Sequence, residues 1–300
     1  MTPPKLRKWQ HRTLIANLVA QAGIVLTGAT VRLTASGLGC PTWPECVAGS
    51  IAPTSEQTEA FRKYIEFGNR LLTFVLLIVA IASLVAVYKH NQDRKLSGLQ
   101  KRRSLTILAL GILGGIFFQA ILGGITVLTG LHPATVAAHF LLSIVLIAGA
   151  TSLRAQRFAS LEKQDAAPLV KKIATAHIVV SFLVLFLGTL VTGSGPHAGD
   201  ATAARFPFDL RTMAWLHADS VIALFGITFG LFVVHGVSAH TKKRLKIFVA
   251  IALSQGLIGY VQWYLDLPEL IVGLHLVGST LVWIAAWRVW LSVTKRMDSK

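Results

Sequence analysis

The chain has 300 residues, of which 53% are hydrophobic and only 14% charged, and its mean hydropathy is +0.62. A composition this apolar excludes an ordinary soluble domain and indicates an integral membrane protein. The formal net charge of +16 is compatible with nucleic-acid binding or with a membrane topology signal, so the positions of the basic residues decide between the two.

Eight stretches are apolar and long enough for transmembrane helices, which need about 20 residues each. They cover residues 13–35, 65–88, 104–128, 134–153, 173–193, 212–236, 245–264 and 270–291. The sequence therefore predicts an all-α integral membrane protein with eight transmembrane helices. The first stretch follows a basic segment, as in a signal peptide, but its apolar run is long and lacks a convincing cleavage site, so we expect a retained helix.

Most of the 29 lysines and arginines fall at the two ends of the chain and in every second connection. These basic segments are residues 5–12, 89–103, 154–172, 242–246 and 288–300. The opposite connections hold only Arg62, Lys63, Arg205 and Arg211. Because basic residues accumulate on the cytoplasmic side of a membrane, the pattern predicts that both termini are cytoplasmic. It also indicates a lipid bilayer, and no nucleic acid, as the partner of the positive charge.

An internal repeat links two helix pairs at a constant offset of 136 residues. Gln119, Gly123, His139 and Ser143 recur as Gln255, Gly259, His275 and Ser279. A weaker match joins RLTASG (32–37) to LVTGSG (190–195). The repeat predicts two four-helix bundles, residues 1–153 and 173–300, joined by a cytoplasmic linker over 154–172. Since each half has an even number of helices, we expect a pseudo-two-fold axis along the membrane normal.

Polar side chains inside apolar helices are costly and mark functional positions. Each even-numbered helix carries some near its outer end: Glu66, Asn69 and Arg70; His139; His217 and Asp219; His275. The key residue lies about five positions from each helix start, which is a depth of roughly 7–8 Å. One such histidine is usually a packing residue, but three at one level, two of them related by the repeat, favour a ligand site.

Imidazoles from facing helices are a common way to hold haem iron axially, whereas zinc normally needs further ligands. Small and aliphatic residues next to His139 and His275 leave room for a flat apolar ring. Arg32 and Arg70, near the outer surface, are candidates to meet the propionates of the ring. The alternative is that both arginines extend to the membrane interface.

Cys40 and Cys46, the two cysteines of the chain, lie in the predicted outer connection LGCPTWPECVAG (38–49). The six-residue spacing in a proline-containing loop permits a disulfide in an oxidising compartment. The pair is either a structural staple of the loop or a redox-active pair, and the sequence leaves both interpretations open.

Several segments resemble the haem A synthases, membrane enzymes that convert haem O into haem A for cytochrome oxidase. They are, in order, TGATVRLTASGLGCPTWPEC, EFGNR, QAILGGITVLTG, LVTGSGPHAGD and LIVGLHLVGS, and the resemblance spans residues 23–285. It implies a haem b cofactor with His217 and His275 as axial ligands. It also implies haem O bound in the N-terminal half through His139, a catalytic Glu66, and an extracytoplasmic cysteine pair at Cys40 and Cys46.

The resemblance further implies a bacterial plasma membrane location, dioxygen as co-substrate, and haem O synthase and cytochrome oxidase assembly proteins as partners. The electron donor, the oligomeric state and the role of Asp219 cannot be read from the sequence. Glu66, in the first turn of its helix, has an alternative role as a carboxylate favoured by the helix dipole.

The chain departs from the family in two places. Asn69 stands where the family's Glu-x-x-His motif has its histidine, and an amide is a poor ligand for haem iron. We therefore expect the substrate iron to be bound by His139 alone, with one face free for dioxygen. A second cysteine pair between the fifth and sixth helices has no counterpart here, which excludes a relay between two disulfides.

Two alternative functions remain. A di-haem electron-transfer protein would need two histidines in each half, and Asn69 breaks that symmetry. A thiol-disulfide oxidoreductase acting through Cys40 and Cys46 would normally need a second cysteine pair to pass electrons on.

Overall fold

The computed structural model describes residues 6–57, 60–156 and 166–294. Within them the chain forms eight helices: α1 (Lys8–Leu33), α2 (Arg62–Leu96), α3 (Arg103–Leu128), α4 (Pro133–Gln156), α5 (Pro168–Ser194), α6 (Leu210–Val233), α7 (Ala239–Tyr264) and α8 (Glu269–Thr294). All eight are long and apolar enough to cross a membrane, which confirms the predicted all-α membrane fold.

Several helices extend beyond the apolar stretches that predicted them. α2 continues to Leu96 instead of ending near residue 88, and α5 begins at Pro168 within the predicted linker 154–172. A helix satisfies its own backbone hydrogen bonds, so it can continue into the polar membrane interface after its apolar side chains end. Residues 157–165 of that linker lie outside the described residues.

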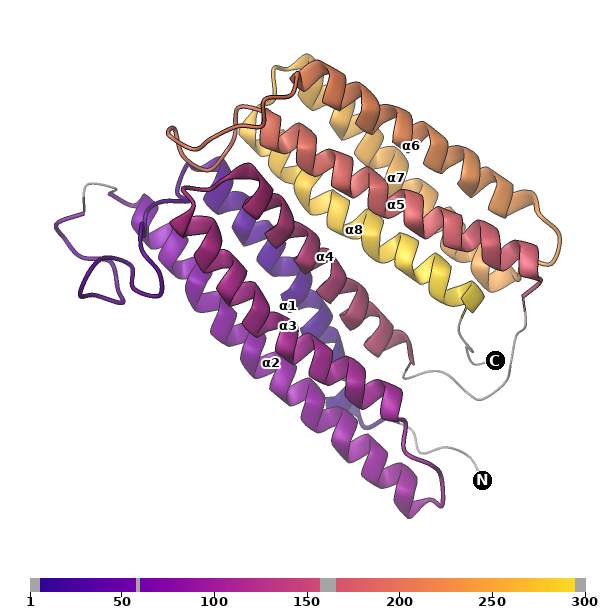
Figure 1. The fold of residues 1–300 in the computed structure, drawn as a ribbon. Helices are drawn as coiled ribbons and strands as arrows, with labels where there is room; N and C mark the ends of the chain where they lie inside the picture. The colour runs from indigo at the N-terminus through magenta and orange to yellow at the C-terminus, as the bar shows by residue number, and fades with distance from the viewer. Residues whose placement is uncertain (1–5, 58–59, 157–165, 295–300) are drawn as a thin grey trace.

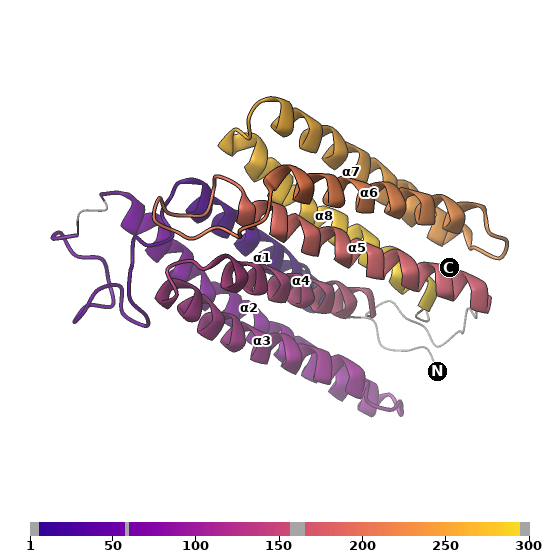
Figure 2. The same ribbon diagram turned by 45° about the horizontal axis from the view of Figure 1, so that its top comes forward.

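The helices form two groups of four, α1–α4 and α5–α8 (Figure 1, Figure 2). Within the first group α1 and α3 each contact both α2 and α4, and within the second α5 and α7 each contact both α6 and α8. Each group is therefore a ring of four helices. In such a ring α2 lies diagonally opposite α4, and α6 lies diagonally opposite α8, across the interior of the group.

The buried positions repeat between the two groups. Four of the six buried positions of α3, Leu105, Ala109, Ile112 and Ile116, have buried counterparts 136 residues later in α7, which are Thr241, Leu245, Phe248 and Ala252. Every buried position of α1, from Gln10 to Ala29, has a buried counterpart in α5 exactly one fixed step of 160 residues later. This offset is two residues longer than the offset between RLTASG and LVTGSG. The pseudo-two-fold axis itself stays a prediction.

The two groups meet along α1, α4, α5 and α8. Trp283 and Trp287 of α8 donate indole hydrogen bonds to α4, to the carbonyl oxygen of Ile144 (2.8 Å) and to Ser152 Oγ (2.7 Å). The rings of Trp283, Trp287 and Trp290 follow one another, with centres 5.5 and 4.8 Å apart. Spacings of four and three residues keep these rings on one face of α8, so the seam between the groups is an aromatic one.

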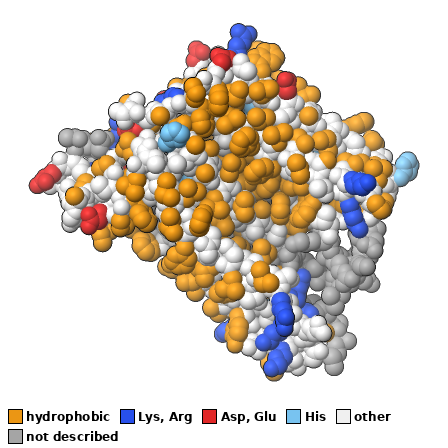
Figure 3. Space-filling model, in the orientation of Figure 1, with side chains coloured by type: hydrophobic (Ala, Val, Ile, Leu, Met, Phe, Trp, Pro, Cys, Tyr) orange, Lys and Arg blue, Asp and Glu red, His pale blue; other side chains and the backbone are white. Residues whose placement is uncertain are grey.

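The two ends of the bundle differ. We call the end where the odd-numbered helices finish the disulfide end, because the loop between α1 and α2 carries both cysteines there, and the other the terminal end (Figure 1). Hydrophobic side chains cover most of the face between them, with charged ones mainly toward the margins (Figure 3). Of the basic residues behind the topology prediction, Lys5, Arg157, Lys163, Lys295, Arg296 and Lys300 lie outside the described residues.

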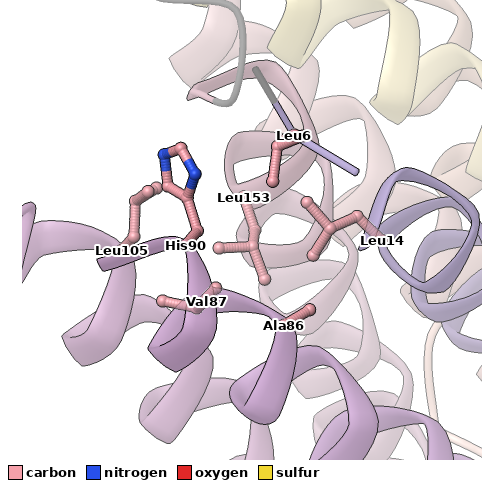
Figure 4. A pocket seen from close by; sticks show the side chains of 7 residues that line it. All are labelled: Leu6, Leu14, Ala86, Val87, His90, Leu105 and Leu153. Carbon is pink, nitrogen blue, oxygen red and sulfur yellow. The ribbon is translucent and has the colours of Figure 1, made fainter. Parts of the chain in front are cut away.

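A small pocket lies near the terminal end, among α1–α4 (Figure 4). Its lining is Leu6, Leu14, Ala86, Val87, His90, Leu105 and Leu153. Its volume of about 10 Å³ holds at most one water molecule, so it is a packing defect and not a ligand site.

The indole hydrogen bonds at the seam predict different effects for two similar substitutions. Trp283→Phe removes a bond to α4, whereas Trp290→Phe removes an indole nitrogen that has no hydrogen-bond partner among the described residues. We expect Trp283→Phe to lower the free energy of unfolding by about 1 kcal/mol more than Trp290→Phe. Thermal unfolding in detergent measures the difference, and equal midpoints would contradict the role of this bond.

Candidate functional site

Three histidines stand at the same depth in their helices. His139 lies six residues into α4, His217 seven into α6 and His275 six into α8, each counted from the disulfide end. The three histidines therefore lie at a common level in their helices, as the sequence predicts.

His217 and His275 face each other across the interior of the second helix group. Their ring centres are 6.4 Å apart and their planes are inclined by 80°. A metal bonded at about 2 Å to one nitrogen of each imidazole would place the ring centres roughly 6 Å apart. His217 Nδ1 bonds the carbonyl oxygen of Val184 at 3.0 Å, so its Nε2 is the nitrogen available to a metal. The pair thus fits axial ligation of a haem iron.

Each histidine ring lies over a glycine of the preceding helix. A Cβ built on Gly188 or Gly259 would stand 3.4 Å from Cε1 of His217 or His275, and one on Gly123 would stand 3.2 Å from Cε1 of His139. An added Cβ at Gly123 would crowd the ring of His139, whereas one at Gly188 or Gly259 would reach an ordinary contact distance. Gly123 and Gly259 are part of the repeat found in the sequence, but their role as ring supports, and that of Gly188, emerges only in the structure.

His139 is further fixed through its backbone. Gln119 Nε2 on α3 donates to the carbonyl oxygen of His139 (3.1 Å) and to Ser143 Oγ (2.6 Å), and Ser143 Oγ donates to the same carbonyl (3.2 Å). The serine one turn after the histidine therefore bonds backbone, not the imidazole. His139 Nδ1 has no hydrogen-bond partner among the described residues.

Cys40 and Cys46 form a disulfide, and both residues are fully buried. The loop that carries them packs on α3, where the ring of Trp43 lies so close to Gly124 that a Cβ there would collide with it. A buried disulfide is poorly placed to exchange with thiols of other proteins, which weakens the oxidoreductase alternative.

Glu66 is almost completely buried beneath this loop, with 4% of its surface exposed. Its Oε2 accepts the backbone N–H of Cys40 at 2.6 Å. Its Oε1 accepts from Arg70 Nε at 3.1 Å and from Arg70 Nη2 at 2.6 Å. Both carboxylate oxygens are thus oriented by the loop and by the next turn of α2.

Arg70 joins the loop to α2. Besides its ion pair with Glu66, it donates to the carbonyl oxygens of Cys40 (2.6 Å), Thr42 (2.9 Å) and Glu45 (3.2 Å). The guanidinium is therefore directed at the loop and not outward toward a propionate. Asp219 is exposed on α6.

Arg32 has a comparable role at the seam between the helix groups. It donates to the carbonyl oxygens of His197 and of Thr192, the latter at 2.7 Å. His197 Nε2 in turn bonds the carbonyl oxygen of Leu267 at 2.7 Å. His197 thereby connects the α5–α6 loop to the α7–α8 turn.

The structure thus brings together His217 with His275, and Glu66 with Arg70 and the disulfide loop. Asn69 lies on α2 beside this second cluster, and its Oδ1 is buried without a hydrogen-bond partner among the described residues. No group of three or more His, Cys, Asp or Glu residues that could hold a metal ion occurs in the described residues. A two-histidine site suits a metal whose remaining ligands come with its cofactor.

Fold and site define a helical membrane protein with a bis-histidine site that fits haem. Residues 11–214 match the model of the COX15-CtaA family, described as cytochrome oxidase assembly protein. This is more than half of the chain, and the chain belongs to this family. The match includes Cys40, Cys46, Glu66 and His139, while His217 lies three residues beyond it.

The chain is also similar to curated proteins named heme A synthase. It is 30% identical over 211 residues to that of Halalkalibacterium halodurans, covering 69% of this chain and 66% of the relative. It is 34% identical over 183 residues to that of Lysinibacillus sphaericus (59% and 56%) and 28% identical over 207 residues to that of a Bradyrhizobium species (60% and 55%). The similarity therefore spans no more than about two thirds of these relatives' length.

The Arg70 contacts predict how the loop opens. Hydrogen bonds to a charged group contribute about 1.5–3 kcal/mol, so Arg70→Gln should raise the open population of the loop roughly tenfold or more. The measurement is the rate at which maleimide labels Cys40 and Cys46 in the presence of a mild dithiol reductant. Arg62→Gln, at the exposed start of α2, is the matched control and should label as slowly as the parent. Equal labelling rates in both variants would contradict the role of Arg70 in holding the loop closed.

Proposed function

We propose that this chain is a haem A synthase, which oxidises a ring methyl group of haem O to a formyl group with the help of a haem b. The His217–His275 pair, at the separation that fits an axially ligated iron, carries the proposal. Membership of the cytochrome oxidase assembly family and the similarity to proteins named heme A synthase support it.

The reaction needs two successive hydroxylations at one carbon. Each consumes one dioxygen molecule, two electrons and two protons, inserts one oxygen atom and releases one water. The resulting hydrated aldehyde then loses water to give the formyl group. An iron porphyrin supplies the oxidising chemistry when it is bound, and the protein supplies position, protons and a route for electrons.

The C-terminal half suits the electron-transfer task. His217 and His275 would hold haem b, and a bis-imidazole iron would supply electron transfer and would not bind dioxygen. Gly188 and Gly259 keep both rings in place against α5 and α7. We assign this half to passing electrons to the N-terminal half.

The N-terminal half suits the oxygenation. His139 would hold the iron of haem O, and Glu66 lies at the same end of this helix group. Because the Cys40 amide and Arg70 orient both oxygens of Glu66, the carboxylate is positioned to move a proton or to stabilise a cationic intermediate. The disulfide loop packs against Glu66 and Arg70 at this end.

The proposal includes an orientation in the membrane. We propose that the disulfide end faces outward and that both termini are cytoplasmic in a bacterial plasma membrane, as the distribution of basic residues supports. Dioxygen is the co-substrate. A haem O synthase would supply the substrate, and cytochrome oxidase assembly would use the product.

Co-expression with a haem O synthase tests the proposal. The parent should accumulate haem A together with haem b, whereas Glu66→Gln should lose haem A at least about a hundredfold and keep haem b, because proton transfer contributes factors of this size. Glu56→Gln, in the exposed part of the same loop, should match the parent. A Glu66→Gln variant as productive as the parent would remove Glu66 from the reaction, and haem b without haem A in the parent would favour the di-haem electron carrier.

A further inference from the structure

Three arginines from three different helices approach one another near the terminal end of the bundle. They are Arg154 on α4, Arg244 on α7 and Arg288 on α8. The charges of Arg154 and Arg244 both repel that of Arg288, and Arg154 also repels Arg244. Because like charges held close together cost free energy, an anion bound among these side chains would stabilise the structure.

A hydrogen bond fixes α8 against α4 next to this arginine cluster. Trp287, which precedes Arg288, donates to Ser152 Oγ on α4 at 2.7 Å. α4 and α8 run in the same direction, from the disulfide end to the terminal end. Arg154 follows Ser152 by two residues and Arg288 follows Trp287 by one. The two arginines therefore differ in level by only about one residue, or ~1.5 Å along the helix axes.

A second hydrogen bond places Arg244 at the same level. Ser292 Oγ on α8 donates to Thr241 Oγ1 on α7 at 3.0 Å. Because α7 and α8 run in opposite directions, Arg288, one turn before Ser292, lies level with the residues one turn after Thr241. Arg244 is three residues after Thr241 and shares its face of α7. The three arginines thus lie at one depth around α8.

The cluster lacks a negatively charged partner among the residues that the structure describes. None of the ion pairs formed by those residues includes one of the three arginines. All three are half-buried. Arg154 Nε is buried and has no hydrogen-bond partner within the described ranges, and Arg244 Nε donates to His240 Nε2 at 3.4 Å. A buried N–H donor without an acceptor is costly, so it points to a ligand that accepts from it.

An exposed apolar strip on α8 leads to the cluster. Leu274 and Leu281 precede Arg288 by fourteen and seven residues, so the three lie on one face of the helix. Both leucines are exposed. Leu281 is ~10 Å from Arg288 along the helix axis, which is within the roughly 15 Å depth of one leaflet. A ligand with an anionic head and an apolar chain fits this arrangement.

We propose that Arg154, Arg244 and Arg288 bind the phosphate of an anionic phospholipid from the leaflet at the terminal end, with an acyl chain along Leu281. Guanidinium groups match phosphate oxygens with paired hydrogen bonds, and basic pockets between transmembrane helices bind anionic head groups. Because α4 belongs to the first helix group and α7 and α8 to the second, the lipid joins the two groups at their seam. The site needs no haem, so it is independent of the proposed function.

Native mass spectrometry of the detergent-solubilised protein tests the site with phosphatidylglycerol as the probe. The parent should bind one phosphatidylglycerol at least about tenfold more tightly than phosphatidylcholine, because hydrogen bonds to charged groups contribute factors of this size. Arg288→Gln should remove this preference. Lys242→Gln removes the same charge from an exposed position of α7 and should match the parent. A parent without the preference, or an Arg288→Gln variant that keeps it, would overturn the proposal.

Inorganic phosphate separates a lipid site from a site for a free anion. It has the charge of the head group but no acyl chain, so at equal concentration it should leave phosphatidylglycerol bound to the parent. Displacement of the lipid at equal concentration would contradict the lipid as the occupant.

The acidic residues Glu162, Asp165 and Asp298 lie outside the described residues, and a further variant tests them as counter-ions. Glu162→Gln, Asp165→Asn and Asp298→Asn together should leave the affinity for phosphatidylglycerol unchanged. A tenfold rise in that affinity would show that the chain's own carboxylates occupy the cluster, and would overturn the proposal.

Thermal unfolding provides a readout that a purely structural arginine would not change in this way. In neutral detergent, Arg288→Gln should unfold at a higher temperature than the parent, because one repulsive charge is gone. Phosphatidylglycerol should raise the unfolding midpoint of the parent and not that of the variant, since only the parent binds it. An equal rise in both proteins would contradict the site.

Discussion

The contact of an imidazole ring with a glycine of the neighbouring helix is the constraint on which this structure depends. It occurs at Gly123, Gly188 and Gly259, and it sets the depth and direction of His139, His217 and His275. Because glycine has no side chain, the Cε1 edge of each ring lies directly against the neighbouring helix. The 6.4 Å separation of the His217 and His275 rings follows from two such contacts on opposite sides of one bundle.

The N-terminal half has the same four-helix arrangement but different side chains at its site. Asn69 replaces one histidine, and a loop with a buried disulfide packs at the end of the group. Arg70 and the Cys40 amide connect that loop to Glu66, so the loop, the carboxylate and the start of α2 form one unit. We propose that the C-terminal half would hold an iron through two imidazoles, and that the N-terminal half would hold one through His139 at the same end as the oriented carboxylate of Glu66.

The sequence predicted the helices and the level of the histidines because both depend on apolar length and helical spacing alone. It also allowed a disulfide between Cys40 and Cys46, since the spacing and compartment permit one. It did not predict the contacts of Arg32 and Arg70, whose partners are backbone carbonyls of loops that no residue type reveals. The register of α1 with α5 was also missed by two residues, because the loop-end match gave a different offset from the buried positions within the helices.

The central claim is that His217 and His275 hold a haem iron between them, and the spectrum of the purified ferric protein tests it most directly. The account predicts a low-spin bis-imidazole signal by electron paramagnetic resonance and a matching Soret band, both lost when His217 and His275 are replaced together by alanine. A double variant that keeps the low-spin signal and the Soret band of the parent would contradict the account.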